Sequence, residues 1–347
     1  MVAGNLVIGD LSKLRSTSRR LHLVLTPCYK KLCLENIGKL TALQWAALRG
    51  HVELIELAIL NGADIEKPLG RFLDKTAPRL SDRPSSICRF VNGTYLYHPQ
   101  ATIPWTPLYL AACSGKRGAI EVLLKAGARM QCFNGMDTPA HVSATKGDVG
   151  CMKAFIVAGF DINTRGSGDR TILHQAMFGG VKMVKYLLWH AGGEKLVNAK
   201  DYYHRTPLHF VAGSFPIRYN RRVITELLLQ NGANIHAIDM YGYTPAHLAA
   251  YPGDVDTMRV LIAAGIHFHA RDGFEETILH RAMRNRKGVL EYLLRQEGVR
   301  EIIHLKDNNG WTPLRLARLA GQWKAIELLV EQAENTQARE DLELAVW

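Results

Sequence analysis

The sequence predicts an all-α fold, a solenoid of about eight helix-turn-helix repeats with short loop hairpins and one long insert. Three observations predict it. A pattern led by threonine recurs every 32 to 38 residues after one longer first gap. Glycines follow most of these threonines at two fixed offsets, and apolar residues lie at helical spacing between them. The pattern begins at Thr41, Thr106, Thr138, Thr171, Thr206, Thr244, Thr277 and Thr312.

Each of these threonines is expected to begin a short first helix. A threonine side chain can cap a helix N-terminus, and a proline at the next position loses nothing by lacking an N–H group. A glycine nine residues after the threonine suits the left-handed conformation that ends a helix. The prolines are Pro107, Pro139, Pro207, Pro245 and Pro313, and the glycines are Gly50, Gly115, Gly147, Gly180, Gly253 and Gly321.

A second helix is expected between that glycine and another one, which lies 21 residues after the threonine in six repeats. Apolar runs such as Val122–Leu124 would bury one face of it. One unit cannot bury its apolar faces alone, so neighbouring units must stack. Trp45, Trp189 and Trp323 fall within helices and are predicted to lie in the core. The second glycines are Gly62, Gly127, Gly159, Gly192, Gly265 and Gly298, with Gly232 five residues late.

The segments Thr106–Leu108, Thr206–His209 and Thr244–His247 resemble the ankyrin repeat, and the resemblance covers roughly residues 41 to 335. It implies a binding module or scaffold rather than an enzyme. It also implies a structural role for the histidine at the fourth position of the repeat, which bonds to neighbouring backbone in that family. These histidines are His141, His174, His209, His247 and His280.

The repeats also divide the chain. The expected parts are an N-terminal helical cap (1–40), the first repeat (41–65), an inserted loop or hairpin (66–104), repeats two to eight (105–335) and an acidic C-terminal tail (336–347). The insert is about thirty residues longer than the other connections and contains Asn92-Gly93, a hairpin-turn signal. It is either a functional loop or a tolerated surface excursion.

The N-terminal segment 11–22, followed by Thr26-Pro27, resembles the second half of an F-box, which fungal F-box proteins often carry just before ankyrin repeats. The family motif opens with a Leu-Pro and a first helix, whereas only ten residues precede the match here. The alternative is a helical cap that shields the first repeat. If the resemblance holds, it implies contact with a Skp-type adaptor through Leu11, Leu14, Leu21 and Leu25.

Composition and charge narrow the functional classes. The formal net charge is +11, but the basic residues are scattered, which is typical of a solvated surface rather than a nucleic-acid footprint. The six cysteines show no zinc or disulfide framework, and no signal segment or apolar run of about 20 residues is present. We expect a cytoplasmic or nuclear monomer. No catalytic motif, cofactor motif or metal site is recognised, so we expect no enzyme and no cofactor.

In ankyrin arrays partners usually contact the loop tips and the exposed side of the first helices, so the resemblance implies a protein partner at those positions. They are rich in Tyr, Trp and Arg, the residue types of interface hot spots. We expect a protein-interaction scaffold, whose sharper form is the substrate receptor of an SCF-type ubiquitin ligase. The alternative is a nuclear nucleic-acid or chromatin-associated factor. The partner-binding candidates are Tyr202, Tyr203, Arg205, Met240, Tyr241, Tyr243, Tyr251, Phe274, Arg284, Asn308, Asn309 and Trp311.

Overall fold

The computed structural model describes residues 36–37, 40–68, 105–131, 136–189, 192–213, 220–284 and 288–334. The chain forms two compact units, one up to Ser167 and one from Gly168 onward. The predictions for the F-box-like leucines, for the acidic tail and for residues 69–104 of the insert lie outside the described residues.

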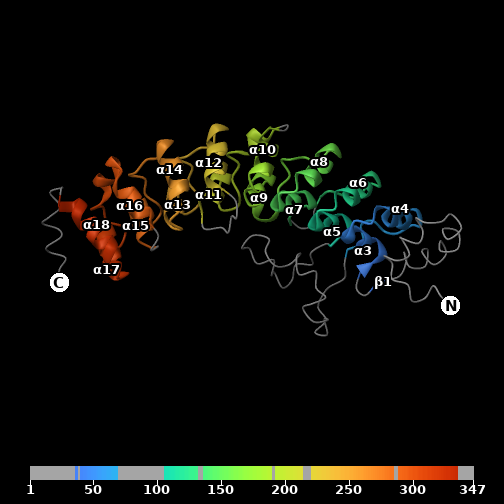
Figure 1. The fold of residues 1–347 in the computed structure, drawn as a ribbon, viewed down its shortest axis with the longest axis horizontal. Coiled ribbons are helices and arrows are strands. Elements are labelled where there is room, and N and C mark those ends of the chain that lie inside the picture. Colours follow the sequence, from blue (N-terminus) through green and yellow to red (C-terminus); the bar gives the residue numbers. More distant parts are fainter. Residues whose placement is uncertain are drawn as a thin grey trace. The chain divides into compact units, whose positions relative to one another are not determined.

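The first unit is built from three helix pairs. Two short antiparallel strands, β1 (Asn36–Ile37) and β2 (Leu40–Thr41), lead into the first pair. The first helices α3, α5 and α7 pack in a row, and the second helices α4, α6 and α8 form another row (Figure 1). The pairs are α3 (Ala42–Arg49) with α4 (Val52–Leu60), α5 (Pro107–Ser114) with α6 (Arg117–Lys125), and α7 (Pro139–Lys146) with α8 (Val149–Val157).

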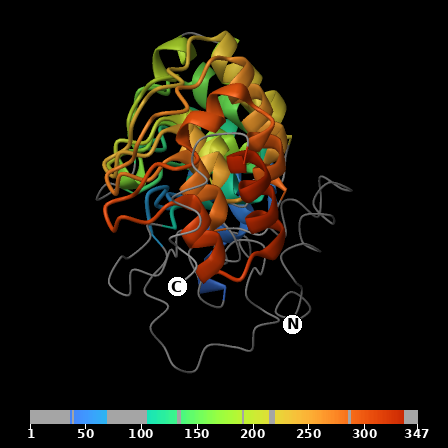
Figure 2. The same cartoon turned by 90° about the vertical axis from the view of Figure 1, so that its left-hand side faces the viewer.

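The second unit repeats the arrangement five times. Its first helices α9, α11, α13, α15 and α17 form one row, its second helices α10, α12, α14, α16 and α18 form another, and its loops gather on one side (Figure 2). The 3-10 turn η2 (Ser167–Asp169) precedes it. The helices are α9 (Ile172–Gly179), α10 (Val181–Trp189), α11 (Pro207–Ala212), α12 (Arg221–Gln230), α13 (Pro245–Ala250), α14 (Val255–Ala263), α15 (Ile278–Met283), α16 (Val289–Leu294), α17 (Pro313–Leu319) and α18 (Trp323–Glu334).

These eight helix pairs in the described residues confirm the all-α repeat prediction. All eight threonines precede a first helix with extended backbone, and Gly50, Gly115 and Gly147 end theirs in the left-handed conformation. Gly298 differs: it has no left-handed φ and lies inside the 3-10 segment η4 (Glu297–Ile302). A Cβ there would meet the ring of Phe268 at 2.5 Å, so close packing explains this glycine.

The prediction for the tryptophans was wrong in two cases. Trp189 is 68% exposed and Trp323 is 77% exposed. They are the last residue of α10 and the first of α18, so each lies at a helix end. Trp45 is half-buried and stacks on His51 with the ring centroids 5.1 Å apart.

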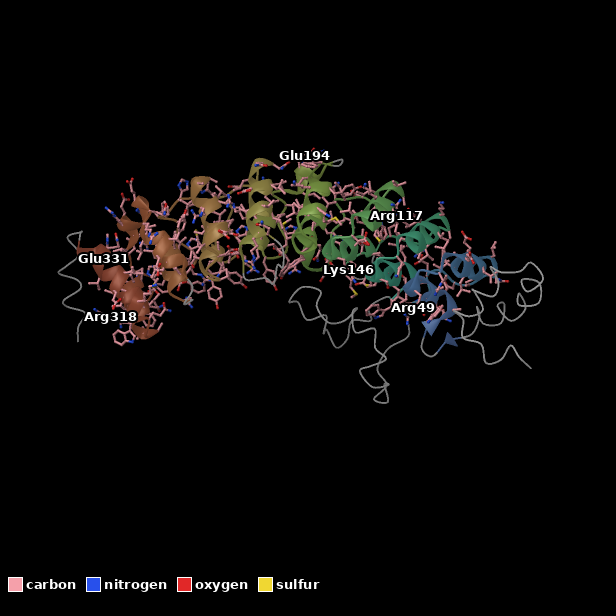
Figure 3. The ribbon with its side chains drawn as sticks, in the orientation of Figure 1. Arg49, Arg117, Lys146, Glu194, Arg318 and Glu331 are labelled. Atoms are coloured by element: carbon pink, nitrogen blue, oxygen red, sulfur yellow. The ribbon has the colours of Figure 1, made fainter. Side chains whose placement is uncertain are left out.

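Charged side chains project from the helices, as Arg117 does in the first unit and Glu331 in the second (Figure 3). Alanines at the sixth position of the repeat, such as Ala46, Ala176 and Ala249, are completely buried, and their small side chains let neighbouring helices approach closely. Within the part of the chain that the structure describes, no helix is both long and apolar enough to cross a membrane.

Candidate protein-binding surface

The second unit presents four loops of one design, each closed by a buried aspartate. In the loop of Asp239, the backbone N–H of this residue donates to the carbonyl oxygen of Tyr243 at 3.0 Å. Its carboxylate Oδ1 accepts from the N–H groups of Tyr241 at 2.9 Å and Tyr243 at 3.0 Å. The same three hydrogen bonds recur around Asp201, Asp272 and Asp307. Each loop is therefore a hairpin whose shape is fixed from inside.

The hairpins are also bonded to one another through their backbones. The N–H of Met240 donates to the carbonyl of Tyr203 at 2.9 Å, and the N–H of Gly273 donates to the carbonyl of Tyr241 at 2.8 Å. A third bond, of 3.0 Å, runs from the N–H of Asn308 to the carbonyl of Phe274. Side chains on successive tips are thus held at a fixed spacing.

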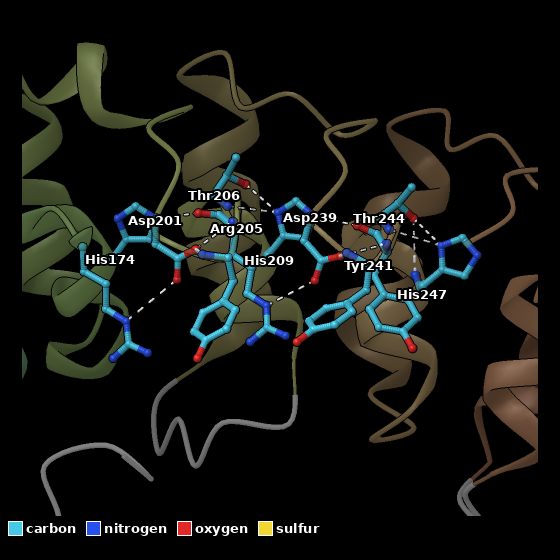
Figure 4. A network of polar contacts seen from close by, with 12 residues as sticks. His174, Asp201, Arg205, Thr206, His209, Asp239, Tyr241, Thr244 and His247 are labelled. Atoms are coloured by element: carbon cyan, nitrogen blue, oxygen red, sulfur yellow. Dashed lines mark hydrogen bonds and ion pairs between the residues drawn. The ribbon is translucent and has the colours of Figure 1, made fainter. Parts of the chain in front are cut away.

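A histidine in each first helix fastens the next hairpin. His209 Nδ1 lies 3.1 Å from the backbone nitrogen of Thr206, and its Nε2 lies 3.0 Å from the carbonyl oxygen of Tyr243 (Figure 4). Because a backbone N–H can only donate, Nδ1 is the acceptor, and Nε2 therefore carries the proton and donates. The links from His174, His247 and His280 have the same form. This confirms the structural role predicted for these four histidines.

Burial keeps these rings neutral. It lowers the pKa of His209 to about 4 and that of His247 to about 4, and it lowers the pKa of His280 in the same direction. Hydrogen bonds to the carbonyls of Tyr243, Glu276 and Trp311 act the other way but are outweighed. A charged imidazolium would lose its water, and nearby carboxylates such as Asp239 beside His209 compensate only in part.

An arginine supports the carboxylate of the first two hairpins. Arg170, which precedes Thr171, lies 3.9 Å from Asp201, and Arg205, which precedes Thr206, lies 3.2 Å from Asp239. Arg205 also lies over the ring of Tyr203, with its Cζ 5.5 Å from the centroid. The corresponding positions in the next two repeats hold Tyr243 and Glu276 instead.

The sequence-predicted candidates lie on the tips and on the adjoining first helices. Tyr202, Met240 and Phe274 are 68%, 51% and 52% exposed, and Tyr203, Tyr241, Tyr251, Arg284, Asn308 and Asn309 are exposed as well. Arg205, Tyr243 and Trp311 are only partly exposed because they pack under the tips. We call this set, from Tyr202 to Trp311, the tip surface.

Arg281, which was not among the residues predicted from the sequence, packs against two residues of the tip surface. Its guanidinium carbon is 4.4 Å from the ring centroid of Tyr243 and 5.2 Å from that of Tyr251. Its Nη1 is 3.5 Å from Glu276 Oε2, and Arg284 Nη2 donates to Glu276 Oε1. One buried carboxylate thus holds two arginines on one face of α15.

The four aspartates were also missed, although a signal was available. Each lies five residues before the threonine of the next first helix, so the spacing from Asp201 to Thr206 recurs three more times. Two of the hairpins also have glycine at their fourth residue, counted from the aspartate: Gly242 and Gly310. Together with the recurring spacing, these glycines predict a turn at each aspartate. Arg281 has no comparable repeat signal, because its role depends on aromatic residues from two neighbouring segments.

Comparison with known families accounts for most of the chain. The family model described as "Ankyrin repeats (3 copies)" matches residues 108–201, 140–239, 194–272 and 247–340. The single-repeat model, "Ankyrin repeat", matches residues 39–68.

Two of the curated relatives are much longer proteins than this chain. The human "Transient receptor potential cation channel subfamily A member 1" is 26% identical over 225 residues, and the Arabidopsis thaliana "E3 ubiquitin-protein ligase KEG" is 23% identical over 255 residues. Each match covers 61% of this chain, which spans only 20% and 16% of those proteins. Among solved structures, the human ASB11 ankyrin repeat domain matches with a TM-score of 0.52 and 18% identity, covering 70% of this chain and 91% of that one.

Proposed function

Because this chain belongs to the ankyrin repeat family, whose fold is suited to protein–protein interaction, we propose that it is a scaffold that binds a partner protein through its tip surface. The observation that carries the proposal is the row of exposed aromatic side chains on hairpins that are bonded in series. Rigid aromatic groups bury a large area on binding while losing little conformational entropy, so they dominate interface energies.

The tip surface also combines exposure with rigidity. Tyr202, Tyr203, Tyr241 and Phe274 have their backbones fixed by the hairpin aspartates and their neighbours, so binding need not order the loops. A surface that is ordered before binding avoids that entropy cost. Exposed apolar residues gathered in one place on a protein are typical of an interaction site.

The test compares the full chain with a triple variant, Tyr203→Ser, Tyr241→Ser and Phe274→Ser, in affinity purification followed by mass spectrometry. We expect the variant to lose a partner that the unchanged chain recovers, while its urea unfolding midpoint stays close to that of the unchanged chain. A matched control is Leu60→Ser, at an 83% exposed position on α4 away from the hairpins. Recovery of the same proteins by both chains, or of no partner by either, would contradict the proposal.

A finer form of the proposal makes the chain a substrate receptor of an SCF-type ubiquitin ligase, and it rests on the F-box-like residues Leu11, Leu14, Leu21 and Leu25. A relative named as an E3 ubiquitin-protein ligase aligns with 61% of this chain. Co-purification of a Skp-type adaptor with the full chain, lost when the four leucines become alanine, would support this role. If the adaptor is absent from both preparations, residues 1–40 serve as a cap.

The alternative function, a nuclear nucleic-acid or chromatin-associated factor, rests on the net charge of +11. Several arginines of the described residues are already paired with carboxylates, among them Arg205 with Asp239 and Arg221 with Asp254. Fewer cations are then left to contact phosphates, which favours the scaffold. DNA binding whose affinity falls steeply with salt would instead support the alternative.

A further inference from the structure

The arginine that supports the first two hairpins is absent from the next two, where Tyr243 and Glu276 stand at the equivalent positions. Where Arg205 pairs with Asp239, the equivalent Tyr243 faces Asp272 and offers no positive charge. Asp272 Oδ2 is buried and has no hydrogen-bond partner among the described residues. Burial also raises the pKa of this carboxyl. The last two hairpins therefore lack the arginine that accompanies the aspartates of the first two, and such departures from a repeated pattern cluster at functional sites.

Tyr243 contacts Arg281 instead. The phenol oxygen accepts from Arg281 Nη1 at 3.3 Å, and the ring lies beneath the guanidinium. Tyr251 packs on the same group from α13's end, and Phe274 lies 6.4 Å from Tyr243 between ring centroids. With tyrosine in place of arginine, this position no longer supports a buried carboxylate and instead forms part of an aromatic setting around Arg281, whose side chain is 12% exposed.

The charges in this region are arranged in layers. The carboxylates of Asp239, Asp272 and Glu276 are buried, with the whole residues 3%, 4% and 1% exposed. The side chain of Arg284, by contrast, is 50% exposed while it donates to Glu276. A guanidinium has five N–H donors, so much of its capacity faces solvent. In the pair of Arg284 with Glu276, the cation is therefore the accessible member and the carboxylate lies beneath it.

We infer that Arg284 and Arg281, walled by Tyr243, Tyr251 and Phe274, form a subsite for a carboxylate side chain of an acidic, extended peptide segment of the partner. This inference rests on the proposed function and specifies the partner's chemistry. Arginine binds carboxylates through paired N–H donors, and the surrounding rings exclude water, which strengthens the contact. Apolar side chains flanking the acidic residue would pack on the exposed rings of Tyr251 and Phe274.

The test uses a random peptide library displayed on phage and selected on the immobilised full chain. We expect enriched peptides to carry Asp or Glu beside apolar residues, and a synthetic peptide from this set to bind more weakly as salt rises. Its affinity should fall about tenfold or more for Arg284→Gln, the loss that one charge-assisted contact typically causes. Arg284→Lys should keep part of the affinity because it keeps the charge.

The matched control is Arg222→Gln, which removes a comparably exposed arginine that pairs with Glu226 on the second helix α12. This variant should bind the peptide as tightly as the unchanged chain does. Enriched peptides without acidic residues, or equal binding by Arg284→Gln, would overturn the acidic subsite. If such peptides still lose binding to the triple tip variant, the scaffold function stands alone. If the library yields no binder, or if binders ignore every substitution on the tips, both proposals fail.

Discussion

His209 in the first helix of the fifth repeat lies 3.0 Å, through its Nε2, from the carbonyl oxygen of Tyr243, which closes the hairpin of the sixth. One imidazole therefore joins three elements: its own helix cap at Thr206, its own helix and the next hairpin. Removing the imidazole should therefore destabilise two repeats at once.

We expect His209→Ala to lower the free energy of unfolding by about 3 kcal/mol, since it leaves a buried carbonyl unsatisfied and opens a cavity. Urea unfolding followed by circular dichroism measures this. His269→Ala provides the control, because that side chain is 58% exposed and only pairs with Glu301 at the surface; it should change stability by less than about 0.5 kcal/mol. Equal effects of the two substitutions would contradict the assigned role.

Stability should fall as the pH falls from about 6.5 towards 4. The pKa of His209 and of His247 is about 4 in the folded chain against an ordinary value of 6.5, so the unfolded chain takes up protons first. Above pH 6.5 neither state is protonated there and the slope vanishes. Between the two values each histidine contributes a slope of about 1.4 kcal/mol per pH unit. A His209→Gln, His247→Gln double variant should show a flatter dependence; an unchanged profile would refute the assignment.

Two aspartates in equivalent positions should respond differently to the same substitution. Asp239→Asn removes the charge that compensates Arg205, and we expect a loss of about 2 kcal/mol. Asp272→Asn removes a carboxylate whose second oxygen has no partner among the described residues, so the loss should be below about 1 kcal/mol. Thermal or urea unfolding of both variants measures the difference, and the reverse order would show that the supporting arginine contributes little.

The fourth residue of each hairpin, counted from its aspartate, should favour glycine. His204 has φ 60° and Gly242, its equivalent, has φ 77°. Left-handed backbone is strained for residues with a Cβ, so His204→Gly should raise the free energy of unfolding by about 0.5 to 1 kcal/mol. Gly242→Ala should lower it, because the new Cβ would also come within 2.6 Å of the Gly273 nitrogen. A destabilised His204→Gly variant would mean that the imidazole itself supports the tip.

The helices could be predicted from the sequence because the same capping and apolar signals recur from repeat to repeat. Thr206 and Thr244 cap helices in the structure as their spacing predicts, and the neighbouring repeats supply independent copies of the same evidence. Features that do not recur between repeats are harder to predict. Trp189 and Trp323 were misplaced because a helix end lacks the period that distinguishes a buried face from an exposed one.

The candidate site was predictable in its location but not in its chemistry. Tip positions follow from the repeat, and residues such as Tyr202 and Phe274 are exposed there. The arrangement around Arg281 could not be predicted, because Tyr243, Tyr251 and Glu276 come from different segments and their contacts depend on how those segments pack. Whether these residues contact a partner stays a prediction until the variants are measured.

The bonds that join the hairpins in series use only main-chain groups, as in the pairing of Met240 with Tyr203 and of Gly273 with Tyr241. The side chains at those tips are therefore not needed to hold the loops in place. Mutation can replace them one at a time without eroding the framework, so a lineage, or an engineer, could redirect this chain to a new partner by gradual steps. The main-chain hydrogen bonds between the hairpins thus allow the binding specificity of the chain to change while its loops keep their structure.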